Sequence, residues 1–216
     1  MVDRCYAGHN RSATIKAALR RVLGPLDSGG WGVNIGGGFT RLHDRLITID
    51  LEPRDEVDIS ADAHRLPFAE GSLDVVVSQE VFEHLSDPSA ALREAARVLK
   101  PGGQLYLQVP FIIGYHPGPT DYWRFTREGI TELAAGVGLQ VVEQDVAVGT
   151  GTGMYRVTVE FVAAFGGLLP GRGAYLAAKG AAALLLYPLT WLDPLLNRSS
   201  ARDRIPGGYY VIAQKP

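Results

Sequence analysis

The chain has 216 residues, with 21 Lys and Arg against 23 Asp and Glu, so its formal net charge is −2. This length fits one domain, or one domain with a large insertion. The near-neutral charge argues against a protein that binds nucleic acid by neutralising phosphates. A single cysteine, Cys5, excludes an internal disulfide framework and a cysteine-rich metal cluster. The first residues lack the apolar stretch of a secretory signal, so the expected location is the cytoplasm.

Short apolar runs alternate with helical patterns along the first two thirds of the chain. The first predicted helix follows Ser12 and ends at Gly24-Pro25, and two others begin at Asp87-Pro88 and near Thr126. Strands that alternate with helices indicate βαβ units and a mostly parallel, doubly wound α/β sheet. The predicted strands cover 31–35, 46–49, 73–77, 104–109, 139–148 and 208–213.

Residues 149–206 interrupt this alternation. They are rich in Ala, Gly and Leu and predict two further helices, at about 154–168 and about 173–187. We interpret this stretch as a helical insertion before the last strand of a single domain. The other parts of that domain are an N-terminal helical segment (1–30), a cofactor-binding core (31–148) and the last strand (207–216).

The segment 174–192 within the insertion is apolar apart from Lys179. Its length raises the question of a membrane span. Lys179, Gly180 and Pro188 favour instead a helix that is buried or that docks on a surface.

Three successive glycines, Gly36, Gly37 and Gly38, follow the first predicted strand. Glycine permits a sharp turn and lets a ligand approach the backbone closely, although a tight turn alone has the same signature. The second strand ends in Asp50. A carboxylate at this position has two acceptor oxygens, which suit the two hydroxyls of a ribose. With the glycine loop upstream, we prefer this interpretation to a turn-forming aspartate.

Two further polar segments follow strand ends. Asp62-Ala63 offers a carboxylate to an adenine amino group and a backbone N–H to a ring nitrogen. Gln79 and Glu80 come just after the buried strand 73–77, and the segment continues to His84. Ligands bind outside the carboxyl ends of the strands in such sheets, so this segment is expected to line the pocket.

The order and spacing of these motifs resemble a class I S-adenosylmethionine-dependent methyltransferase of the type-eleven methyltransferase domain family. The likeness runs from about Val33 to Val142. Its most specific parts are LPFAEGSLDVVVSQEVFEHL, a helix that carries REAARVL, and KPGGQLYLQVP. The resemblance implies a Rossmann-like, seven-stranded sheet with an antiparallel last strand. It also implies S-adenosylmethionine as the cofactor and S-adenosylhomocysteine as the product.

The resemblance further implies roles for the residues of these motifs. In the family, the glycine loop and the residues after the fourth strand lie against the methionine part of the cofactor. The acidic end of the second strand holds the ribose, and an Asp-Ala-like pair reads the adenine. The cofactor-binding residues implied in this chain are Asn34, Gly36, Gly37, Gly38, Asp50, Leu51, Asp62, Ala63, Gln79 and Glu80.

This chain departs from the family's pattern at two points. Asn34 stands where the family has an acidic residue, and an amide supplies no charge to the amine of the cofactor. The stretch between Gly38 and the second strand is too short for a crossover helix, so only a turn or a short helix is expected at 41–45. A chain with a degenerate cofactor site that acts as an interaction partner is therefore an alternative.

A loop rich in Pro and Gly, 115–126, follows the predicted strand 104–109 and resembles an element of a family branch linked to the tailoring of sugars or secondary metabolites. A hydroxyl acceptor must lose a proton, and histidine is the natural base near neutral pH. His116 and His84 are the two candidates, and either alternatively has a structural role. Asp121 is expected to orient His116, to bind an acceptor hydroxyl, to cap a helix or to pair with Arg124.

Aromatic residues of the same loop either wall the pocket or pack in the core. Tyr122 and Trp123 suit a wall, because aromatic faces attract cations such as a sulfonium, whereas core packing is favoured for Phe125. His9, His43 and His64 lack partners at metal-ligand spacing, so no metal is predicted.

Together these features predict methyl transfer from S-adenosylmethionine to a small molecule, at an oxygen of a sugar-bearing or secondary metabolite. Methylation of nitrogen or carbon, or another use of the cofactor, is the alternative within the fold. The apolar insertion suggests a hydrophobic or lipid-linked acceptor, contact with a membrane surface through 174–192, a homodimer interface, or simple core packing.

Overall fold

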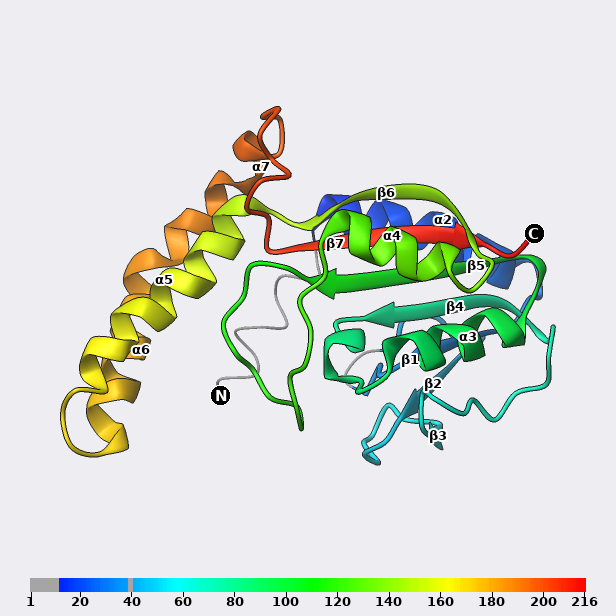
Figure 1. Ribbon diagram of the computed structural model, residues 1–216, viewed down its shortest axis with the longest axis horizontal. Coiled ribbons are helices and arrows are strands. Elements are labelled where there is room, and N and C mark those ends of the chain that lie inside the picture. Colours follow the sequence, from blue (N-terminus) through cyan, green and yellow to red (C-terminus); the bar gives the residue numbers. More distant parts are fainter. Residues whose placement is uncertain (1–11, 39–40) are drawn as a thin grey trace. The chain divides into compact units, whose positions relative to one another are not determined.

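The computed structural model describes residues 12–38 and 41–216. Within them lies a seven-stranded sheet with the strand order β3-β2-β1-β4-β5-β7-β6, drawn in Figure 1. The predicted α/β fold class with a seven-stranded sheet is confirmed. The strands are β1 (Gly32–Ile35), β2 (Leu46–Asp50), β3 (Ile59–Ser60), β4 (Leu73–Gln79), β5 (Leu99–Pro110), β6 (Gln140–Val148) and β7 (Gly208–Gln214).

Strand β1 is the centre of the parallel part of the sheet. It pairs in parallel with β2 and with β4, and all four of its residues are buried. Ile35 lies opposite Ile49 on one side and opposite Ser78 on the other. Strand β3 continues this register, because Asp50 pairs with Ser60. The carboxyl ends of four neighbouring strands therefore reach one edge of the sheet, where ligands bind in α/β folds.

The last strand, β7, runs antiparallel to β5. Near the start of β5, the N–H of Gly102 donates to the carbonyl of Lys215, which follows β7. Just past the end of β5, the N–H of Phe111 donates to Gly207, which precedes β7. The arrows of the two strands accordingly point in opposite directions in Figure 1. The reversed last strand implied by the family resemblance is therefore present.

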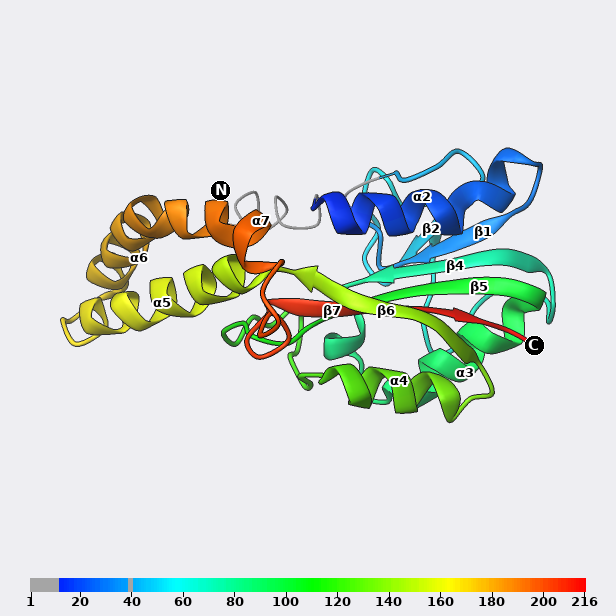
Figure 2. The ribbon, with the colours of Figure 1, turned by 90° about the horizontal axis from the view of Figure 1, so that it is seen from above.

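Helices cover both faces of the sheet. Figure 2 shows α2 (Ala13–Asp27) on one face and α3 (Pro88–Val98) and α4 (Arg127–Ala135) on the other. Both starts predicted for α3 and α4 are confirmed. Asp87 and Thr126 cap these two helices, each accepting a hydrogen bond from the backbone N–H three residues further on.

Two predicted boundaries are wrong. Helix α2 continues through Gly24-Pro25 to Asp27, because proline keeps a helical φ and near the end of a helix removes only one backbone hydrogen bond. The chain turns away from it only near Gly29, whose φ is 98°. Strand β5 starts at Leu99 and not at 104, since Leu99 already pairs with Leu73 before the register shifts. Between β1 and β2, residues 41–45 form a turn and no helix, in line with the expectation.

The chain divides into two compact units. The sheet unit comprises Ala13–Val109, Pro117–Asp145 and Tyr210–Pro216. The helical unit comprises, among the described residues, Ser12, Pro110–His116 and Val146–Tyr209. The predicted insertion 149–206 falls within the helical unit, and the assignment of the whole chain to a single domain stays a prediction. The helices of this unit are α5 (Thr150–Gly166), α6 (Arg172–Leu186), the 3-10 helix η3 (Tyr187–Leu192) and α7 (Asp193–Leu196).

An ion pair within helix α3 holds the loop before β4 through hydrogen bonds to its backbone. Arg97 donates to both carboxylate oxygens of Glu94, at 2.7 and 2.8 Å. It also donates to the carbonyls of Phe68 and Leu66, at 2.9 and 3.1 Å. Glu94 accepts the N–H of Leu66 at 2.9 Å, and the hydrogen bonds from Arg97 help to hold the pKa of Glu94 below its ordinary value. The helix and the loop thus stabilise each other. These hydrogen bonds connect the LPF string of the loop with the REAARVL string of the helix.

We expect Arg97→Ala to lower the free energy of unfolding near pH 7 by about 2 kcal/mol, because it leaves two loop carbonyls and a carboxylate without their donor. Urea unfolding of this variant measures the loss. Arg93→Ala is the matched control on the same helix, since Arg93 is exposed and lies 3.8 Å from a carboxylate oxygen of Asp87. Its expected loss is below about 0.5 kcal/mol.

The same pair of variants should depend on pH in a defined direction. Glu94 has a lowered folded pKa, so its contribution is complete above the ordinary value of 4.5 and is lost as the pH falls through the folded value. The difference in the free energy of unfolding between Arg97→Ala and Arg93→Ala should therefore become smaller as the pH falls below 4.5. Equal losses at pH 7 would contradict the assigned role of Arg97.

Candidate cofactor and acceptor site

The glycine loop after β1 is packed too closely for side chains. Gly36 has a φ of 70°, and its N–H donates to the carbonyl of Ile49 at 2.8 Å. A Cβ atom on Gly36 would lie 2.3 Å from a methyl group of Val81. Backbone conformation and space therefore both require glycine here.

Asn34 lies beneath the middle of this loop. It is 4% exposed, and a Cβ atom on Gly37 would lie 1.8 Å from its Nδ2. The amide that replaces the family's acidic residue therefore supports the loop directly.

Gly38 lies against Asp50. A Cβ atom on Gly38 would lie 3.0 Å from Oδ2 of Asp50, while Oδ1 accepts the N–H of Glu52 at 3.1 Å. The glycine loop and the acidic end of β2 are thus brought together, as the sequence predicts. Beside them is a hollow of about 430 Å³, a size suited to a small molecule. It is lined by Gly38, Arg54, Asp55 and Glu56.

Asp62 comes next along the same edge. The N–H of Ala61 donates to the carbonyl of Asp50 at 3.0 Å, which joins the segment after β3 to the end of β2. Oδ1 of Asp62 accepts the backbone N–H of His64 at 2.9 Å and lies 2.7 Å from Nδ1 of the same residue. These hydrogen bonds, the backbone one foremost, hold the pKa of Asp62 below its ordinary value. The carboxylate therefore stays charged and able to accept. Leu51, 62% exposed, adds an apolar surface at this edge, and Ala63 is buried.

A buried glutamine connects the two residues predicted after β4. Oε1 of Gln108 accepts hydrogen bonds from Nε2 of Gln79 at 3.1 Å and from the hydroxyl of Tyr106 at 3.0 Å. Nε2 of Gln108 donates to Glu80 at 3.4 Å. Burial raises the pKa of Tyr106 far above its ordinary range, so its hydroxyl keeps the proton that it donates.

Glu80 is in the left-handed region, with a φ of 54°. A non-glycine residue in this conformation costs about 1–3 kcal/mol, which the surrounding structure must offset. The backbone carbonyl of Gln108 accepts the N–H of Glu80 at 2.9 Å and so contributes to holding it. Sequence reasoning missed Gln108. Its position at the carboxyl end of a buried strand was the available signal.

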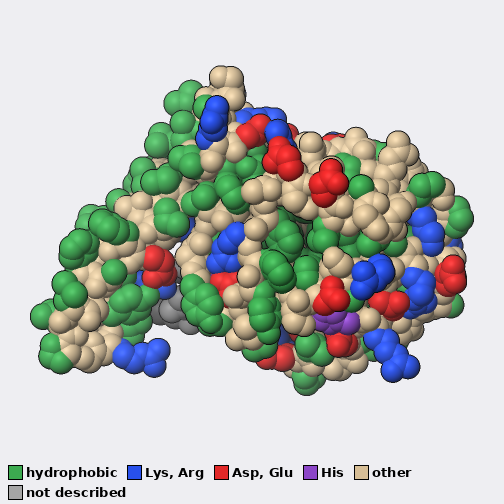
Figure 3. Space-filling model, viewed as in Figure 1, with side chains coloured by type: hydrophobic (Ala, Val, Ile, Leu, Met, Phe, Trp, Pro, Cys, Tyr) green, Lys and Arg blue, Asp and Glu red, His purple; other side chains and the backbone are tan. Residues whose placement is uncertain are grey.

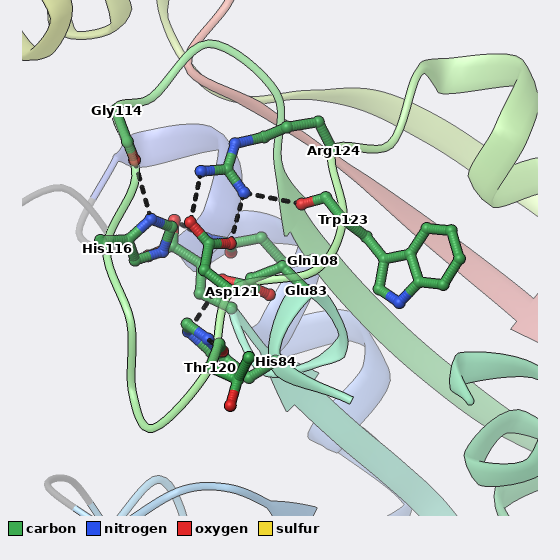
Figure 4. Close-up of polar contacts among 10 residues, drawn as sticks. Glu83, His84, Gln108, Gly114, His116, Thr120, Asp121, Trp123 and Arg124 are labelled. Carbon is green, nitrogen blue, oxygen red and sulfur yellow. Dashed lines mark hydrogen bonds and ion pairs between the residues drawn. The ribbon is translucent and has the colours of Figure 1, made fainter. Parts of the chain in front are cut away.

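The segment Pro117–Thr126 folds back over the turn after β4 (Figure 4). The N–H of Tyr122 donates to the carbonyl of Glu83 at 2.8 Å. Asp121 is 2% exposed and accepts hydrogen bonds from Arg124 through both carboxylate oxygens, at 2.6 and 2.7 Å. The pair with Arg124, one of the alternatives from the sequence, is therefore present. Through it, Asp121 orients the loop.

The same loop fixes the tautomer of His84. Its Nδ1 lies 2.6 Å from the carbonyl oxygen of Thr120, which can only accept, so Nδ1 carries the hydrogen (Figure 4). Nε2 is then the nitrogen that can take up a proton, and Oε1 of Glu83 lies 3.6 Å from it. The buried carboxylate of Glu83 was not singled out from the sequence.

His116 belongs to the helical unit and has a similar arrangement. Its Nδ1 lies 3.0 Å from the carbonyl oxygen of Gly114. By the same argument, Nε2 is the proton acceptor of this ring. Each histidine therefore has the tautomer that a general base needs, and the choice between them stays a prediction.

The aromatic residues of the loop divide into core and surface. Phe125 is buried in the hydrophobic core, as favoured from the sequence. Trp123 is 43% exposed, while its indole N–H donates to the carbonyl of Leu85 at 2.8 Å. Tyr122 is 52% exposed. Two exposed aromatic rings are thus held next to the segment that contains His84.

A family model described as a methyltransferase domain matches residues 40–107. A probable S-adenosylmethionine-dependent methyltransferase of Mycobacterium tuberculosis is 44% identical over 66 residues, which are 31% of this chain and 24% of that protein. The 27-O-demethylrifamycin SV methyltransferase of Amycolatopsis mediterranei is 42% identical over 67 residues, which are 31% of this chain and 24% of that protein. The aligned stretch thus spans about a quarter of either relative. The residues matched by the family model include Asp50, Asp62, Gln79, Glu80 and His84.

Solved structures show the same fold over nearly the whole chain. Phosphoethanolamine N-methyltransferase 2 of Haemonchus contortus, in complex with phosphomonomethylethanolamine and S-adenosylhomocysteine, superposes with a TM-score of 0.56 at 19% identity. The superposition covers 93% of this chain and 52% of that one. Residues 40–107 thus match a methyltransferase domain in sequence, and nearly the whole chain shares the fold of S-adenosylmethionine-dependent methyltransferases. The cyclase SpnF superposes with a TM-score of 0.54 at 19% identity, covering 96% of this chain and 85% of that one, so the fold alone does not define the reaction.

The packing of the glycine loop is open to a direct test. Gly36→Ala should lower the free energy of unfolding by about 2–4 kcal/mol, because it adds a steric clash with Val81 to an unfavourable φ. Gly71→Ala is the control, since Gly71 has a φ of 60° and no atom lies within 4 Å of the position that its Cβ would take. It should lose only about 1 kcal/mol. Similar losses in both variants, measured by urea unfolding, would argue against the close approach of Val81.

Proposed function

We propose that the protein transfers the methyl group of S-adenosylmethionine to a hydroxyl group of a small molecule. The observation that carries this proposal is the alignment of strand ends in the sheet unit. The glycine loop, Asp50, Asp62 and Gln79 all follow or end parallel strands at one edge of the sheet. That edge is where class I folds bind their ligands.

The residues present fit this cofactor. The carboxylate of Asp50 lies beside Gly38, where a side chain would block a ligand from reaching it. Asp50 would therefore hold the ribose hydroxyls. Asp62 is kept ionised and would accept the adenine amino group. The glycine loop, Asn34 and Gln79 would line the methionine part. The cofactor supplies an electrophilic methyl group on a positively charged sulfur.

The chain's own contribution to transfer is alignment, exclusion of water and removal of a proton. Nε2 of His116 or of His84 would take the proton of the acceptor hydroxyl, in a tautomer fixed by a backbone carbonyl. Asp121 would not contact the acceptor and would instead position the loop that it holds together with Arg124. The exposed rings of Tyr122 and Trp123 would offer a surface to an apolar or sugar-bearing acceptor.

An oxygen acceptor of the secondary-metabolite type is supported by the names of relatives. Besides the rifamycin enzyme, a ubiquinone biosynthesis O-methyltransferase of Xanthomonas oryzae is 38% identical over 69 residues, 31% of this chain and 26% of that protein. A nitrogen acceptor, as in the phosphoethanolamine enzyme, would not need the histidine base. The dependence of transfer on a histidine therefore distinguishes the two chemistries.

We expect Asp50→Ala to raise the Kd for S-adenosylmethionine by roughly 10- to 100-fold, because two ribose hydroxyls would lose a charged acceptor. Calorimetric titration with S-adenosylmethionine and S-adenosylhomocysteine measures this. Glu52→Ala is the matched control, since Glu52 is exposed in the same loop and pairs with Arg54. Its Kd should stay within about threefold of the wild type. Absence of binding by the folded wild-type protein would favour the degenerate module, in which Asn34 has replaced the family's acid.

The histidine base is tested with asparagine variants, because an asparagine amide can still donate to the carbonyl that fixes each ring. We expect His116→Asn or His84→Asn to lower kcat by roughly 10²- to 10⁴-fold at unchanged Kd for the cofactor. Transfer of a labelled methyl group to hydroxyl-bearing acceptors found by screening provides the rate. If both variants retain more than about a tenth of the wild-type kcat, a histidine base is wrong.

A further inference from the structure

The helical unit exposes an unusual amount of apolar surface. Helices α5 and α6 form a hairpin, and Figure 3 shows hydrophobic side chains spread along it. Leu168, Leu184 and Leu185 are 81%, 79% and 77% exposed. Monomeric proteins in water rarely leave a contiguous apolar surface of this kind uncovered. The other large exposed hydrophobic side chains between residues 150 and 196 are Met154, Phe161, Val162, Phe165, Leu169, Leu176, Tyr187, Trp191, Leu192 and Leu195.

Two charged side chains in the middle of the hairpin turn toward one another, whereas Arg172 at the start of α6 is exposed. Glu160 of α5 pairs with Lys179 of α6 and also accepts the hydroxyl of Tyr175 at 2.7 Å. The side chains of Glu160 and Lys179 are only 29% and 23% exposed. At the foot of the hairpin, Asp193 accepts the N–H of Gly151 at 2.7 Å and the hydroxyl of Thr152. The Glu160–Lys179 pair thus lies between the helices while leucines lie outside, which is the reverse of an amphipathic hairpin in water.

The dimensions of the hairpin suit a lipid layer. Helix α5 has 17 residues and is therefore about 25 Å long, close to the thickness of a bilayer's hydrocarbon core. The helical stretch Arg172–Leu196 has a window with a mean hydropathy of 1.2, of which only 6% is buried. A core helix of similar composition would be mostly buried, so core packing does not account for this stretch.

The ends of the hairpin carry the residue types that favour a membrane interface. Tyr187 packs edge-on against Tyr155 and Trp191, with ring centroids 6.0 and 6.3 Å apart, at the foot of the hairpin. Tyr and Trp prefer the headgroup level of a bilayer. Residues 149–206 contain six basic and three acidic residues, whereas the whole chain is slightly acidic. Three of the basic residues, Arg198, Arg202 and Arg204, follow the last apolar turn.

We propose that the α5–α6 hairpin inserts its leucine and phenylalanine side chains into a lipid bilayer with anionic headgroups. A bilayer matches both features of the hairpin, because acyl chains cover apolar side chains and headgroup phosphates attract the flanking arginines. A second copy of this chain would bring the same positive excess against itself, which makes it the weaker occupant. The proposal concerns the helical unit alone and does not depend on methyl transfer.

Co-flotation with vesicles tests the proposal on the full chain. Wild-type protein should bind vesicles made of equal parts phosphatidylcholine and phosphatidylglycerol, and should bind pure phosphatidylcholine less. The double variant Leu184→Ser/Leu185→Ser should lower the bound fraction about tenfold or more, since two exposed leucines lose their burial in lipid. Val142→Ser is the matched control, because Val142 lies on β6, outside the hairpin, and is 51% exposed. It should bind like the wild type.

Trp191 provides a second readout that a merely misfolded variant would not imitate. Lipids with brominated acyl chains should quench the fluorescence of the wild-type protein, and this quenching should fall in Trp191→Phe. The circular dichroism of the leucine variant should match that of the wild type.

Three results would overturn the proposal. The first is that the wild-type protein binds neither kind of vesicle, and the second is that Leu184→Ser/Leu185→Ser binds vesicles as well as the wild type. The third is that the wild type does not bind vesicles but forms a homodimer, which Leu184→Ser/Leu185→Ser dissociates. Analytical ultracentrifugation detects the last of these.

Discussion

The parallel pairing of β1 with both β2 and β4 is the constraint on which the sheet unit depends. Once Ile35 is opposite Ile49 and Ser78, every loop that follows these strands starts at one edge. Close packing on both faces of the buried strands fixes this register, because a slip by one residue would exchange the side chains that pack on the two faces. Polar residues that are far apart in sequence, such as Asp50 and Gln79, thereby become available to a single ligand.

Close packing at that edge restricts what each loop can contain. Gly36 excludes a side chain because Val81 occupies the space, and Glu80 adopts a left-handed backbone beside the buried amide of Gln108. The left-handed backbone of Glu80 costs free energy, whereas Gly36 adopts its positive φ without strain. Strain that persists at the carboxyl edge of a parallel sheet is typical of a binding site, since the surrounding structure must stabilise it. The geometry therefore agrees with the chemistry that the residue types indicate.

The sequence predicted the elements that depend on local patterns. Runs of β-branched residues, such as 73–77, mark buried strands, and Asp87 and Thr126 mark helix starts because capping is a local interaction. The predicted end of α2 was wrong because Leu26 packs in the core and the helix therefore continues beyond Pro25. Gln108 and Glu83 were missed because a single polar residue next to an apolar run has no periodic signature. Their importance comes from neighbours on other strands and loops, which only the fold brings near.

The helical unit illustrates a different limit of sequence reasoning. A stretch rich in Ala, Gly and Leu has the same composition whether protein atoms or lipid cover it, so its pattern left several interpretations open. The pairing of Glu160 with Lys179 between the helices is the argument for the lipid interpretation that we propose, because a charge in an apolar medium needs a partner. In water, leucine would pack inward and this pair would face out. The opposite arrangement of these side chains is the observation on which the proposed insertion into lipid rests, and composition alone could not reveal it.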